Sequence, residues 1–470
     1  MIPRARGHLD PSPSTYLHDA GRDDARVPGV VVVFSGGAPS ARVIPLPSGP
    51  LELGRGDGSG TIDDGRVSRR HARVAFEDGR CIVTDLGSQN GSFVDGKLAT
   101  PHAPTPAQRV IRLGGSLLVP YADVRPVERA GVRGIDGFVR GPAMQAILEE
   151  VARAARDGTT LHVGGENGTG KEGVAQAFHR AGPRAAGALV AVNCAAIPHA
   201  LAEGQLFGVK RGAYSGAEAD ALGYLQEADG GTLFLDEIAE LDPQIQAKLL
   251  RVLENKEVVP LGASKSRKVA FALCSATNKD LRALVAARTL REDLHYRIAI
   301  PAVTLPALRN RPEEIPALIA QELGKLSPAP RAHVSLVEQC LLRPWPGNIR
   351  ELLAEIRSAA RAALAGGNRV EARHLSATAG NPFGIPMPDA RPVPPGGHDT
   401  HLSDKPPKRT RRVDDEWRRR IEDALRANAG NIAATARSLG QHRNQLRRDI
   451  ESLGIVVDRV AKDDDDGDDD

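Results

Sequence analysis

The segment GENGTGK (residues 165–171) constrains the fold of this 470-residue chain more than any other feature. It follows TTLHVGG, which predicts a strand, and it opens KEGVAQAFHRA, which predicts a helix. Glycines at such a turn let backbone N–H groups face phosphate oxygens, and the helix N-terminus adds its dipole. Lys171 is placed to reach the β- and γ-phosphates of a nucleotide. The segment therefore predicts a P-loop in a parallel α/β sheet.

A second motif, GGTLFLDE (230–237), predicts a buried strand that ends in two carboxylates. Asp236 is placed to hold Mg²⁺, and Glu237 to orient or activate the attacking water. The segment CSATN (274–278) predicts another strand, and it ends in Asn278, a polar side chain suited to sensing the γ-phosphate. One position departs from the general P-loop pattern, because Glu172 stands where Ser or Thr is usual. Together these segments predict a phosphoryl-transfer site built by positioning and electrostatics.

The remaining chain divides around this α/β part. A length of 470 residues predicts about three domains. We predict an all-β sandwich at residues 29–124, an α/β domain with a helical lid at 138–376, and an all-α helix-turn-helix domain at 414–456. The connecting segments are predicted as follows: a disordered arm (1–28), a short linker (125–137), a Pro-rich basic linker (377–413) and an acidic tail (457–470).

Charge and cysteine content limit the environment and the partners. The net charge is only +3, but residues 405–448 are strongly basic, which indicates local contact with nucleic acid. Four separated cysteines without a CxxC pair predict reduced thiols rather than disulfides or a zinc site. No apolar run approaches the roughly 18 residues that span a bilayer. We therefore expect a cytoplasmic protein without a membrane partner.

The sandwich segment carries LGR (53–55), VSRRH (67–71) and DLGSQNGSFVDG (85–96). Over residues 30–120 it resembles a forkhead-associated (FHA) domain. The resemblance implies binding of phosphothreonine peptides, and thus a phosphorylated protein or a Ser/Thr kinase as partner, while His71 is implied to be structural. The alternative is a sandwich that serves only as an interaction surface. The implied phosphopeptide residues are Arg55, Ser68, Arg69, Gln89 and Asn90.

The C-terminal segment reads GNIAATARSLG followed by QHRNQLRRDI. Small alanines that permit close packing, a turn at Gly440 and a following basic helix predict a helix-turn-helix. The segment resembles the Fis-type DNA-binding domain, which implies upstream promoter DNA as partner. The alternative is a solvated basic helix. The residues expected at the DNA are Arg443, Asn444, Gln445 and Arg447 in the groove and Arg448 near phosphate.

Residues 138–375 resemble the sigma-54-dependent bacterial transcription activators, which are enhancer-binding AAA+ ATPases. That family reads GE(S/T)GTGKE, FVAVNCAA, GGTLFLDEIGEL, FREDLYYRL, LPPLRER and WPGNVREL. In the same order this chain reads GENGTGKE, LVAVNCAA, GGTLFLDEIAEL, LREDLHYRI, LPALRNR and WPGNIREL. The resemblance implies ATP and Mg²⁺ as cofactors, sigma-54 RNA polymerase holoenzyme as target, and a homo-oligomeric ring, usually a hexamer.

The same resemblance implies roles for single residues. Arg291 and Arg297 correspond to arginine fingers that reach a neighbouring subunit's γ-phosphate, and Asn193 corresponds to a switch residue that holds Glu237. The family usually has Glu at the position of Glu172. The implied nucleotide-binding set, with Arg350 as second sensor, is Gly165, Glu166, Asn167, Gly168, Thr169, Gly170, Lys171, Glu172, Asn278 and Arg350.

The family presses a GAFTGA loop onto sigma-54 when ATP binds. This chain reads GAYSGA there (Gly212, Ala213, Tyr214, Ser215, Gly216 and Ala217), and Lys210 replaces a usual Glu just before it. Tyr214 adds a hydroxyl, and Ser215 lacks the methyl of Thr. Two functions stay open: a sigma-54-dependent activator under phosphothreonine control, or an FHA-containing DNA-binding scaffold or repressor whose loop no longer remodels sigma-54.

Overall fold

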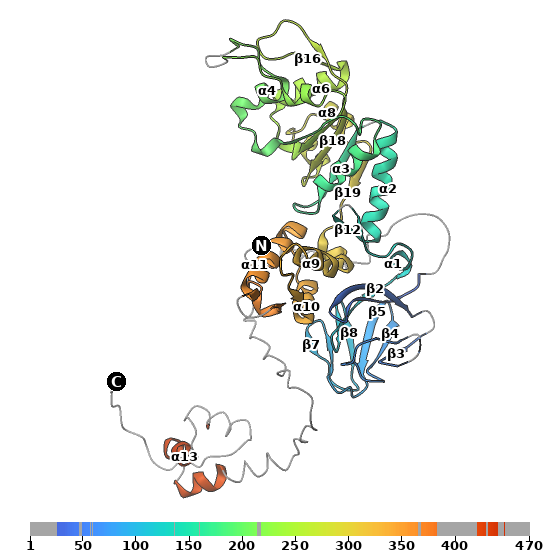
Figure 1. The fold of residues 1–470 in the computed structure, drawn as a ribbon, viewed down its shortest axis with the longest axis vertical. Coiled ribbons are helices and arrows are strands. Elements are labelled where there is room, and N and C mark those ends of the chain that lie inside the picture. Colours follow the sequence, from blue (N-terminus) through green and yellow to red (C-terminus); the bar gives the residue numbers. More distant parts are fainter. Residues whose placement is uncertain are drawn as a thin grey trace, which may run out of the picture. The chain divides into compact units, whose positions relative to one another are not determined.

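The computed structural model divides the chain into two units, Met1–Pro392 and Val393–Asp470, and each is considered by itself (Figure 1). The predicted acidic tail, most of the N-terminal arm and most of the Pro-rich linker lie outside the described residues. The described residues are 26–46, 49–56, 58, 60–135, 137–158, 160–213, 218–364, 368–382, 421–428, 431–439 and 446.

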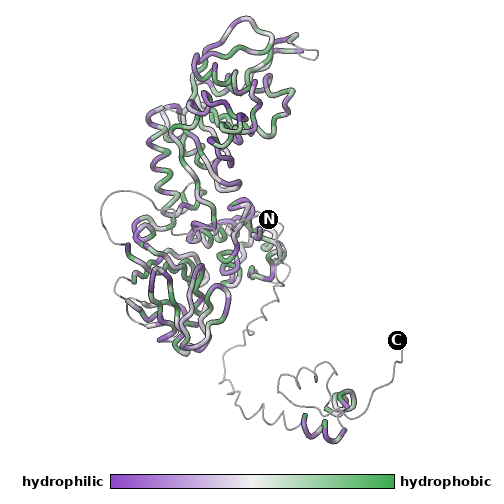
Figure 2. The backbone as a smooth tube through the Cα atoms, turned by 180° about the vertical axis from the view of Figure 1, so that it is seen from behind, coloured by the Kyte–Doolittle hydropathy of each residue, from purple (hydrophilic) through white to green (hydrophobic). Residues whose placement is uncertain are grey.

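The predicted β-sandwich is confirmed. Its antiparallel strands form one sheet in the order β2-β1-β10-β9-β6-β7 and a second in the order β3-β4-β5-β8. Figure 2 shows hydrophobic stretches along these strands and more hydrophilic stretches in the loops. The strands are β1 (Gly29–Ser35), β2 (Ala38–Pro45), β3 (Leu51–Leu53), β4 (Ala72–Glu77), β5 (Arg80–Asp85), β6 (Ser92–Val94), β7 (Lys97–Leu98), β8 (Pro104–Ala107), β9 (Ile111–Leu113) and β10 (Ser116–Tyr121).

Strand β1 is buried on both of its faces. In GVVVVFS, Val30 and Val32 belong to the core between the two sheets, whereas Val31 and Val33 belong to a second core. The paired strand β10 does the same, with Leu118 facing inward and its neighbours facing outward. Successive strand residues point to opposite faces, so a continuous apolar run needs cover on both sides. Helices from residues 315–364 supply that second cover.

The central α/β domain is built on a parallel sheet in the order β14-β15-β18-β13-β19. Its strands are β13 (Leu161–Gly164), β14 (Leu189–Asn193), β15 (Thr232–Asp236), β18 (Ala272–Thr277) and β19 (Ala302–Thr304). The carboxyl ends of parallel strands lie at one edge of the sheet, which brings the end of GGTLFLDE close to the end of CSATN. The helices are α2 (Pro142–Arg156), α3 (Lys171–Ala181), α4 (His199–Phe207), α5 (Tyr224–Glu227), α6 (Pro243–Asn255), α7 (Leu281–Ala286) and α8 (Glu292–Ile298), with 3-10 turns η2 (Cys194–Ala196) and η3 (Ile238–Glu240) and hairpin strands β16 (Glu257–Val258) and β17 (Arg267–Lys268).

The helical lid follows, as predicted. It packs around Trp345, which is fully buried and donates its indole N–H to the carbonyl of Cys340 at 2.7 Å. Its elements are η4 (Leu308–Asn310), η5 (Pro312–Glu314), α9 (Ile315–Leu323), β20 (Arg331–Ala332), α10 (Val334–Leu342), α11 (Asn348–Leu364), β21 (Arg369–Val370) and η6 (Ala372–His374).

The segment 125–137, predicted as a short linker, is folded where the structure describes it. It contains α1 (Arg125–Ala130) and β11 (Arg133–Ile135), which pairs with β12 (Phe138–Arg140). A proline in the first turn favours the start of α1, and Val127 is buried in the second core. The segment predicted as a linker therefore contains regular secondary structure, with the buried Val127 and the pairing of β11 with β12.

In the C-terminal unit, residues 421–427 are helical and α13 spans Ile432–Ser438. Asn431 caps α13, since its side-chain oxygen accepts from the N–H of Ala434 at 3.0 Å. Ile421, Leu425, Ala436 and Leu446 form a small core. Across the described ranges of the whole chain, no helix has the length and apolar content needed to cross a membrane.

Candidate functional site

The P-loop lies between β13 and α3, as the sequence predicted. Gly165, Gly168 and Gly170 have φ values of 148°, 78° and 106°, a region that L-residues with a side chain rarely adopt. Buried Thr169 closes the loop by donating its hydroxyl to the carbonyl of Glu166 at 2.8 Å. The glycines therefore permit the backbone path that a phosphate cradle requires.

Lys171 connects the loop to the carboxyl edge of the sheet. Its side chain is 7% exposed, and its ammonium donates to the Gly165 carbonyl at 3.0 Å and to the Glu237 carboxylate at 3.3 Å. The other carboxylate oxygen of Glu237 accepts from the Thr277 hydroxyl at 3.2 Å and from the Asn278 N–H at 3.3 Å. Lys171, Thr277 and the backbone N–H of Asn278 therefore all contact the Glu237 carboxylate.

Glu237 also has a strained backbone. Its φ of 50° and ψ of 47° are left-handed, a conformation that costs free energy for any residue other than glycine. Strain of this kind persists where the surroundings hold a residue in place, and here two strands and a lysine do so. Thr277 was not predicted from the sequence as a site residue, although it immediately precedes Asn278 in CSATN.

Asp236 ends β15 as a half-buried acid. Burial raises the pKa of its carboxyl, the Lys171 ammonium opposes that rise, and the Glu237 carboxylate adds to it. Glu172, in the first turn of α3, also raises the pKa of Asp236. A divalent cation at this carboxylate would offset the burial cost. The donor set, carboxylates beside a phosphate cradle, matches what Mg²⁺ takes, since this ion keeps waters and phosphate oxygens as further ligands.

Asn193 lies beside the acids, because it pairs in register with Asp236. Its side-chain oxygen accepts from the N–H of Ala195 at 3.0 Å. The Glu237 carboxylate instead contacts Lys171, Thr277 and Asn278, so the structure does not bring Asn193 and Glu237 into a hydrogen bond. The switch role of Asn193 stays a prediction.

The lid grips the P-loop through Glu166. Its carboxylate binds the Arg309 guanidinium at 2.6 and 2.9 Å and the Asn348 side-chain amide at 3.0 Å. The hydrogen bond from Arg309 is the main cause that lowers the pKa of Glu166. The N–H of Ile349 donates to the Gly168 carbonyl at 3.0 Å. Arg309 and Asn348 lie in the segments LPALRNR and WPGNIREL, but neither residue was predicted as a site residue from the sequence.

Arg350, the expected second sensor, is exposed at the start of α11. A Cβ at Gly168 would lie 3.0 Å from the Arg350 Cβ, so its backbone lies directly over the P-loop. Asn167 is also exposed on this loop. The structure therefore brings the P-loop residues, Asn278 and Arg350 to one side of the sheet edge.

The two expected arginine fingers are on or beside α8, and both are exposed. Arg291 precedes the helix and forms an ion pair with Asp293 at 2.7 Å, and the hydrogen bond to Asp293 raises the pKa of Arg291. Arg297 donates to the Leu253 carbonyl at 3.0 Å. Their action on a neighbouring subunit stays a prediction.

The base of the GAYSGA loop is anchored in the α/β domain. Val209 bridges to Ala221 and to Leu261, and Lys210 forms an ion pair with Asp220 across the base. Gly212 and Ala213 are described, but the other predicted contact residues, Tyr214, Ser215, Gly216 and Ala217, lie outside the described residues.

The five predicted phosphopeptide residues lie in adjoining loops at one end of the sandwich. The Arg55 N–H donates to the Ser68 carbonyl at 2.9 Å, and the Gln89 N–H donates to the Ser68 hydroxyl at 3.1 Å. The Asn90 side chain donates to the Arg66 carbonyl at 2.7 Å. Arg69 follows Ser68 and is exposed, as are Arg55 and Asn90. Exposed guanidinium groups next to a hydroxyl can bind a phosphate.

His71 contacts these loops from the interior of the sandwich. It is fully buried, and its ring nitrogens contact the Ser68 N–H at 3.0 Å and the Gly91 carbonyl at 3.3 Å. Burial lowers the pKa of His71. These contacts agree with the structural role expected for this histidine.

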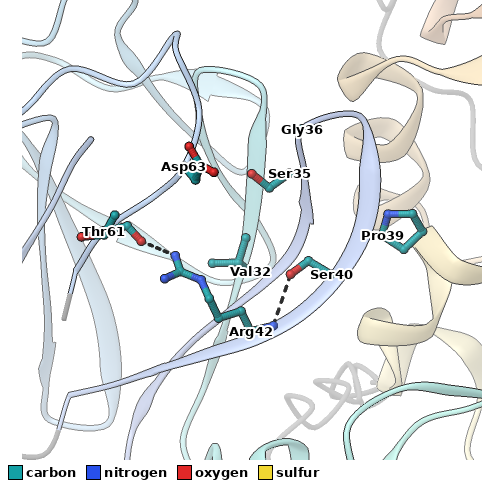
Figure 3. A pocket seen from close by; sticks show the side chains of 8 residues that line it. All are labelled: Val32, Ser35, Gly36, Pro39, Ser40, Arg42, Thr61 and Asp63. Carbon is teal, nitrogen blue, oxygen red and sulfur yellow. Dashed lines mark hydrogen bonds between the residues drawn. The ribbon is translucent and has the colours of Figure 1, made fainter. Parts of the chain in front are cut away.

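A surface pocket of about 420 Å³ lies elsewhere in the sandwich (Figure 3). The Arg42 guanidinium in it donates to the Thr61 carbonyl, so part of its hydrogen-bonding capacity is used within the protein. Its lining residues were not predicted in any site: Val32, Ser35, Gly36, Pro39, Ser40, Arg42, Thr61 and Asp63. The predicted DNA-contacting residues, Arg443, Asn444, Gln445, Arg447 and Arg448, lie outside the described residues.

Comparison with known proteins agrees with this arrangement. The Sigma-54 interaction domain matches residues 138–304, the FHA domain 51–114, and the Fis family of bacterial regulatory proteins 418–450. The hydrogenase transcriptional regulatory protein HoxA of Bradyrhizobium diazoefficiens is 40% identical over 312 residues, which are 65% of this chain and 62% of HoxA. The DNA-binding transcriptional regulator NtrC of Azospirillum brasilense is 36% identical over 347 residues, 69% of this chain and 70% of NtrC.

A solved structure of NtrX from Brucella abortus in complex with ATP is 28% identical, with a TM-score of 0.47, over 67% of this chain and 68% of that one. The fold and the site define a regulator with an FHA domain, an AAA+ ATPase domain and a Fis-type helix-turn-helix domain. The chain belongs to the family of sigma-54-dependent transcriptional activators. It spans 62% of the length of HoxA and 64% of a Nif-specific regulatory protein of Azotobacter vinelandii.

Proposed function

We propose that the chain hydrolyses ATP to remodel sigma-54 RNA polymerase holoenzyme at promoters. The observation that supports this most is the contact of Lys171 with Glu237. The lid also contacts the same P-loop, through the hydrogen bond of Asn348 to Glu166. A nucleotide γ-phosphate at Lys171 would compete for its contact with Glu237. ATP binding would thus change the position of the catalytic acid and of the lid together.

Each site residue has a role in this proposal. Lys171 and the P-loop N–H groups bind the phosphates, Glu237 orients the attacking water, and Asn278 senses the γ-phosphate. Asp236, with Glu237 beside it, would hold Mg²⁺, which when bound neutralises charge on the phosphate oxygens. Arg291 and Arg297 are exposed, as an arginine finger for a neighbouring subunit must be. Hydrolysis would then need a homo-oligomeric ring.

The FHA domain would control the activator by recognising phosphothreonine. Arg55 and Ser68 would bind the phosphate, with Arg69 adding charge and Asn90 holding the ligand backbone. The partner is a phosphorylated protein or a Ser/Thr kinase. The Fis-type domain would bind upstream promoter DNA, and these partners lie in the bacterial cytoplasm.

A second candidate function is a DNA-binding FHA scaffold or repressor that does not remodel sigma-54. The GAYSGA sequence favours it, because both side chains of the expected contact differ from the family's Phe and Thr. Lys210 also differs, and it forms an ion pair with Asp220 at the loop base. The intact set of Lys171, Asp236 and Glu237 favours the activator.

Capture of sigma-54 separates the two candidates. The full chain is mixed with sigma-54 and ADP–aluminium fluoride, which resembles the phosphoryl-transfer transition state, and the complex is followed by gel shift. An activator forms a complex that ADP alone does not support and that Tyr214→Ala and Lys171→Ala abolish. Nucleotide binding without capture, in wild type and in Tyr214→Phe alike, would support the scaffold or repressor.

A further inference from the structure

Three parts of the first unit meet at a buried junction around η5. Arg311, Glu313 and Glu314 are 1%, 5% and 0% exposed. The Tyr121 hydroxyl, at the end of β10 in the FHA domain, donates to the Glu313 carboxyl at 2.6 Å. The N–H of Gly141, which caps α2 of the α/β domain, donates to Glu314 at 2.7 Å. The FHA domain, the α/β domain and the lid therefore share one polar cluster.

The junction extends into the phosphate loop through Arg311. Its guanidinium forms an ion pair with Glu314 at 3.2 Å and donates to the carbonyl of Thr169 at 2.8 Å. Thr169 lies between Gly168 and Gly170, two of the glycines that shape the loop, and two residues before Lys171. The orientation of this carbonyl fixes the peptide plane that follows it, and with it the direction of the Gly170 N–H.

The charges of the junction balance if one acid is neutral. Two carboxyl groups face one guanidinium, and an unpaired buried charge is costly. Burial, followed by the charge of Glu314, raises the pKa of Glu313 to about 7. Glu314 forms the ion pair with Arg311, and Glu313 is the acid that is hydrogen-bonded to Tyr121. The Tyr121 hydroxyl therefore orients Glu313, which is adjacent in sequence to Glu314, the ion-pair partner of Arg311.

The FHA domain contributes far more than one hydrogen bond to this region. Val31, Val33 and Leu117, from the outward face of β1 and β10, share a core with Ile315 and Ile319 of α9. A second polar contact lies away from the junction, where Arg112 of β9 forms an ion pair with Glu338 of α10 at 2.9 Å. The apolar run of β1 needs such a cover, so this packing is a property of the sequence as well as of the structure.

We infer that the FHA domain is docked on the lid as a support of the P-loop, and that Tyr121 and Arg311 are positioning residues for nucleotide binding. Tyr121 holds Glu313, the adjacent Glu314 holds Arg311, and Arg311 holds the Thr169 carbonyl. A loop fixed in its binding conformation loses less entropy when phosphate binds. This inference needs only nucleotide binding by the P-loop, and it is independent of phosphopeptide recognition.

The test measures the affinity of the full chain for a fluorescent ADP analogue. Tyr121→Phe removes one hydroxyl and keeps the ring, and Arg112→Gln is the matched control, since it breaks an FHA–lid contact that does not reach the P-loop. We expect Tyr121→Phe to weaken ADP binding by about fivefold or more, the lower end of coupling between sites, and Arg112→Gln to leave it unchanged. Equal effects of both variants, or none from Tyr121→Phe, would overturn the inference.

Two further variants protect the test from simple loss of folding. Glu313→Gln keeps a neutral acceptor for Tyr121, so it should retain ADP affinity, whereas Glu313→Leu should lose it as Tyr121→Phe does. Hydrogen exchange of the amides at 166–170 should be faster in Tyr121→Phe than in Arg112→Gln at equal thermal stability. Unchanged exchange in Tyr121→Phe, or tighter ADP binding, would show that the junction does not support the loop.

Discussion

The ammonium of Lys171 lies 3.3 Å from the carboxylate of Glu237, so the cation of the P-loop directly contacts the acid that follows β15. Both groups are largely buried, at 7% and 15% exposed, where ionic contacts are stronger than in water. The residue expected to bind phosphate is thus in direct contact with the residue expected to activate water. This contact leads to the first prediction.

Substitutions at the two residues should separate binding from hydrolysis. Lys171→Ala should abolish measurable ADP binding, because it removes the buried ammonium that lies within the P-loop. Glu237→Gln should keep ADP binding and lower the ATPase kcat by about 10²–10⁴-fold, the usual contribution of a general base. Fluorescent ADP titration and steady-state ATPase assays measure the two quantities. Glu240→Gln, an exposed neighbour paired with Lys279, is the control and should leave both unchanged.

The phosphopeptide loops should act independently of the ATPase site. Arg55→Ala should weaken binding of a phosphothreonine peptide by about tenfold or more, because it removes a charge-assisted hydrogen bond, and it should leave ADP binding unchanged. Fluorescence anisotropy with phosphorylated and unphosphorylated peptides measures this. Arg80→Ala, at the opposite end of β4 and β5, is the control. Equal binding of both peptides by the wild type would refute the proposal that the FHA domain recognises phosphothreonine.

The FHA sandwich and the lid should unfold together. Leu117→Ala removes a fully buried side chain from the core they share, and such changes cost about 2–5 kcal/mol. Trp345 lies in the lid part of that core, so in a Trp417→Phe background its fluorescence reports the lid during urea unfolding. The transition should move to lower urea in Leu117→Ala. In the control Leu98→Ala, whose leucine is 63% exposed, it should not move.

Stability should depend on pH through Glu313. Its pKa is about 7 in the folded protein against an ordinary 4.5, so the folded state binds this proton more tightly. The resulting stabilisation is complete below pH about 4.5 and is lost as the pH rises through about 7. Urea unfolding at pH 5 and pH 8 should therefore show a larger loss of stability in the wild type than in Glu313→Gln. Equal losses in the two proteins would contradict the burial of this acid.

The nucleotide site was predictable from the sequence because its parts are local. A glycine-rich turn, an apolar strand ending in Asp236 and Glu237, and a strand ending before Asn278 each carry their own signal. The parallel sheet then brings the three strand ends to one edge. The contacts of Arg309 and Arg311 with the loop were not predicted, because they join residues more than 140 positions apart.

The sequence of β1 indicates that the sandwich packs against another part of the chain, although this packing was not predicted. A sandwich strand with one solvated face alternates, as RCIVTD does in β5, whereas GVVVVF in β1 does not. That run indicates a strand covered on both faces, but it does not say by what. The identity of the cover depends on the pairing of β1 and β10 with α9, which only the tertiary structure supplies.

Formation of heparin-resistant open complexes tests directly whether this chain activates sigma-54 RNA polymerase. The assay uses a sigma-54 promoter with an upstream binding site, sigma-54 RNA polymerase and ATP, and compares wild type, Lys171→Ala and Ser215→Thr. We expect open complexes with the wild type and none with Lys171→Ala. Opening by Ser215→Thr alone would mean that the GAYSGA loop is detuned. No opening by wild type or Ser215→Thr, with ATPase activity intact, would contradict the claim that this chain is an activator.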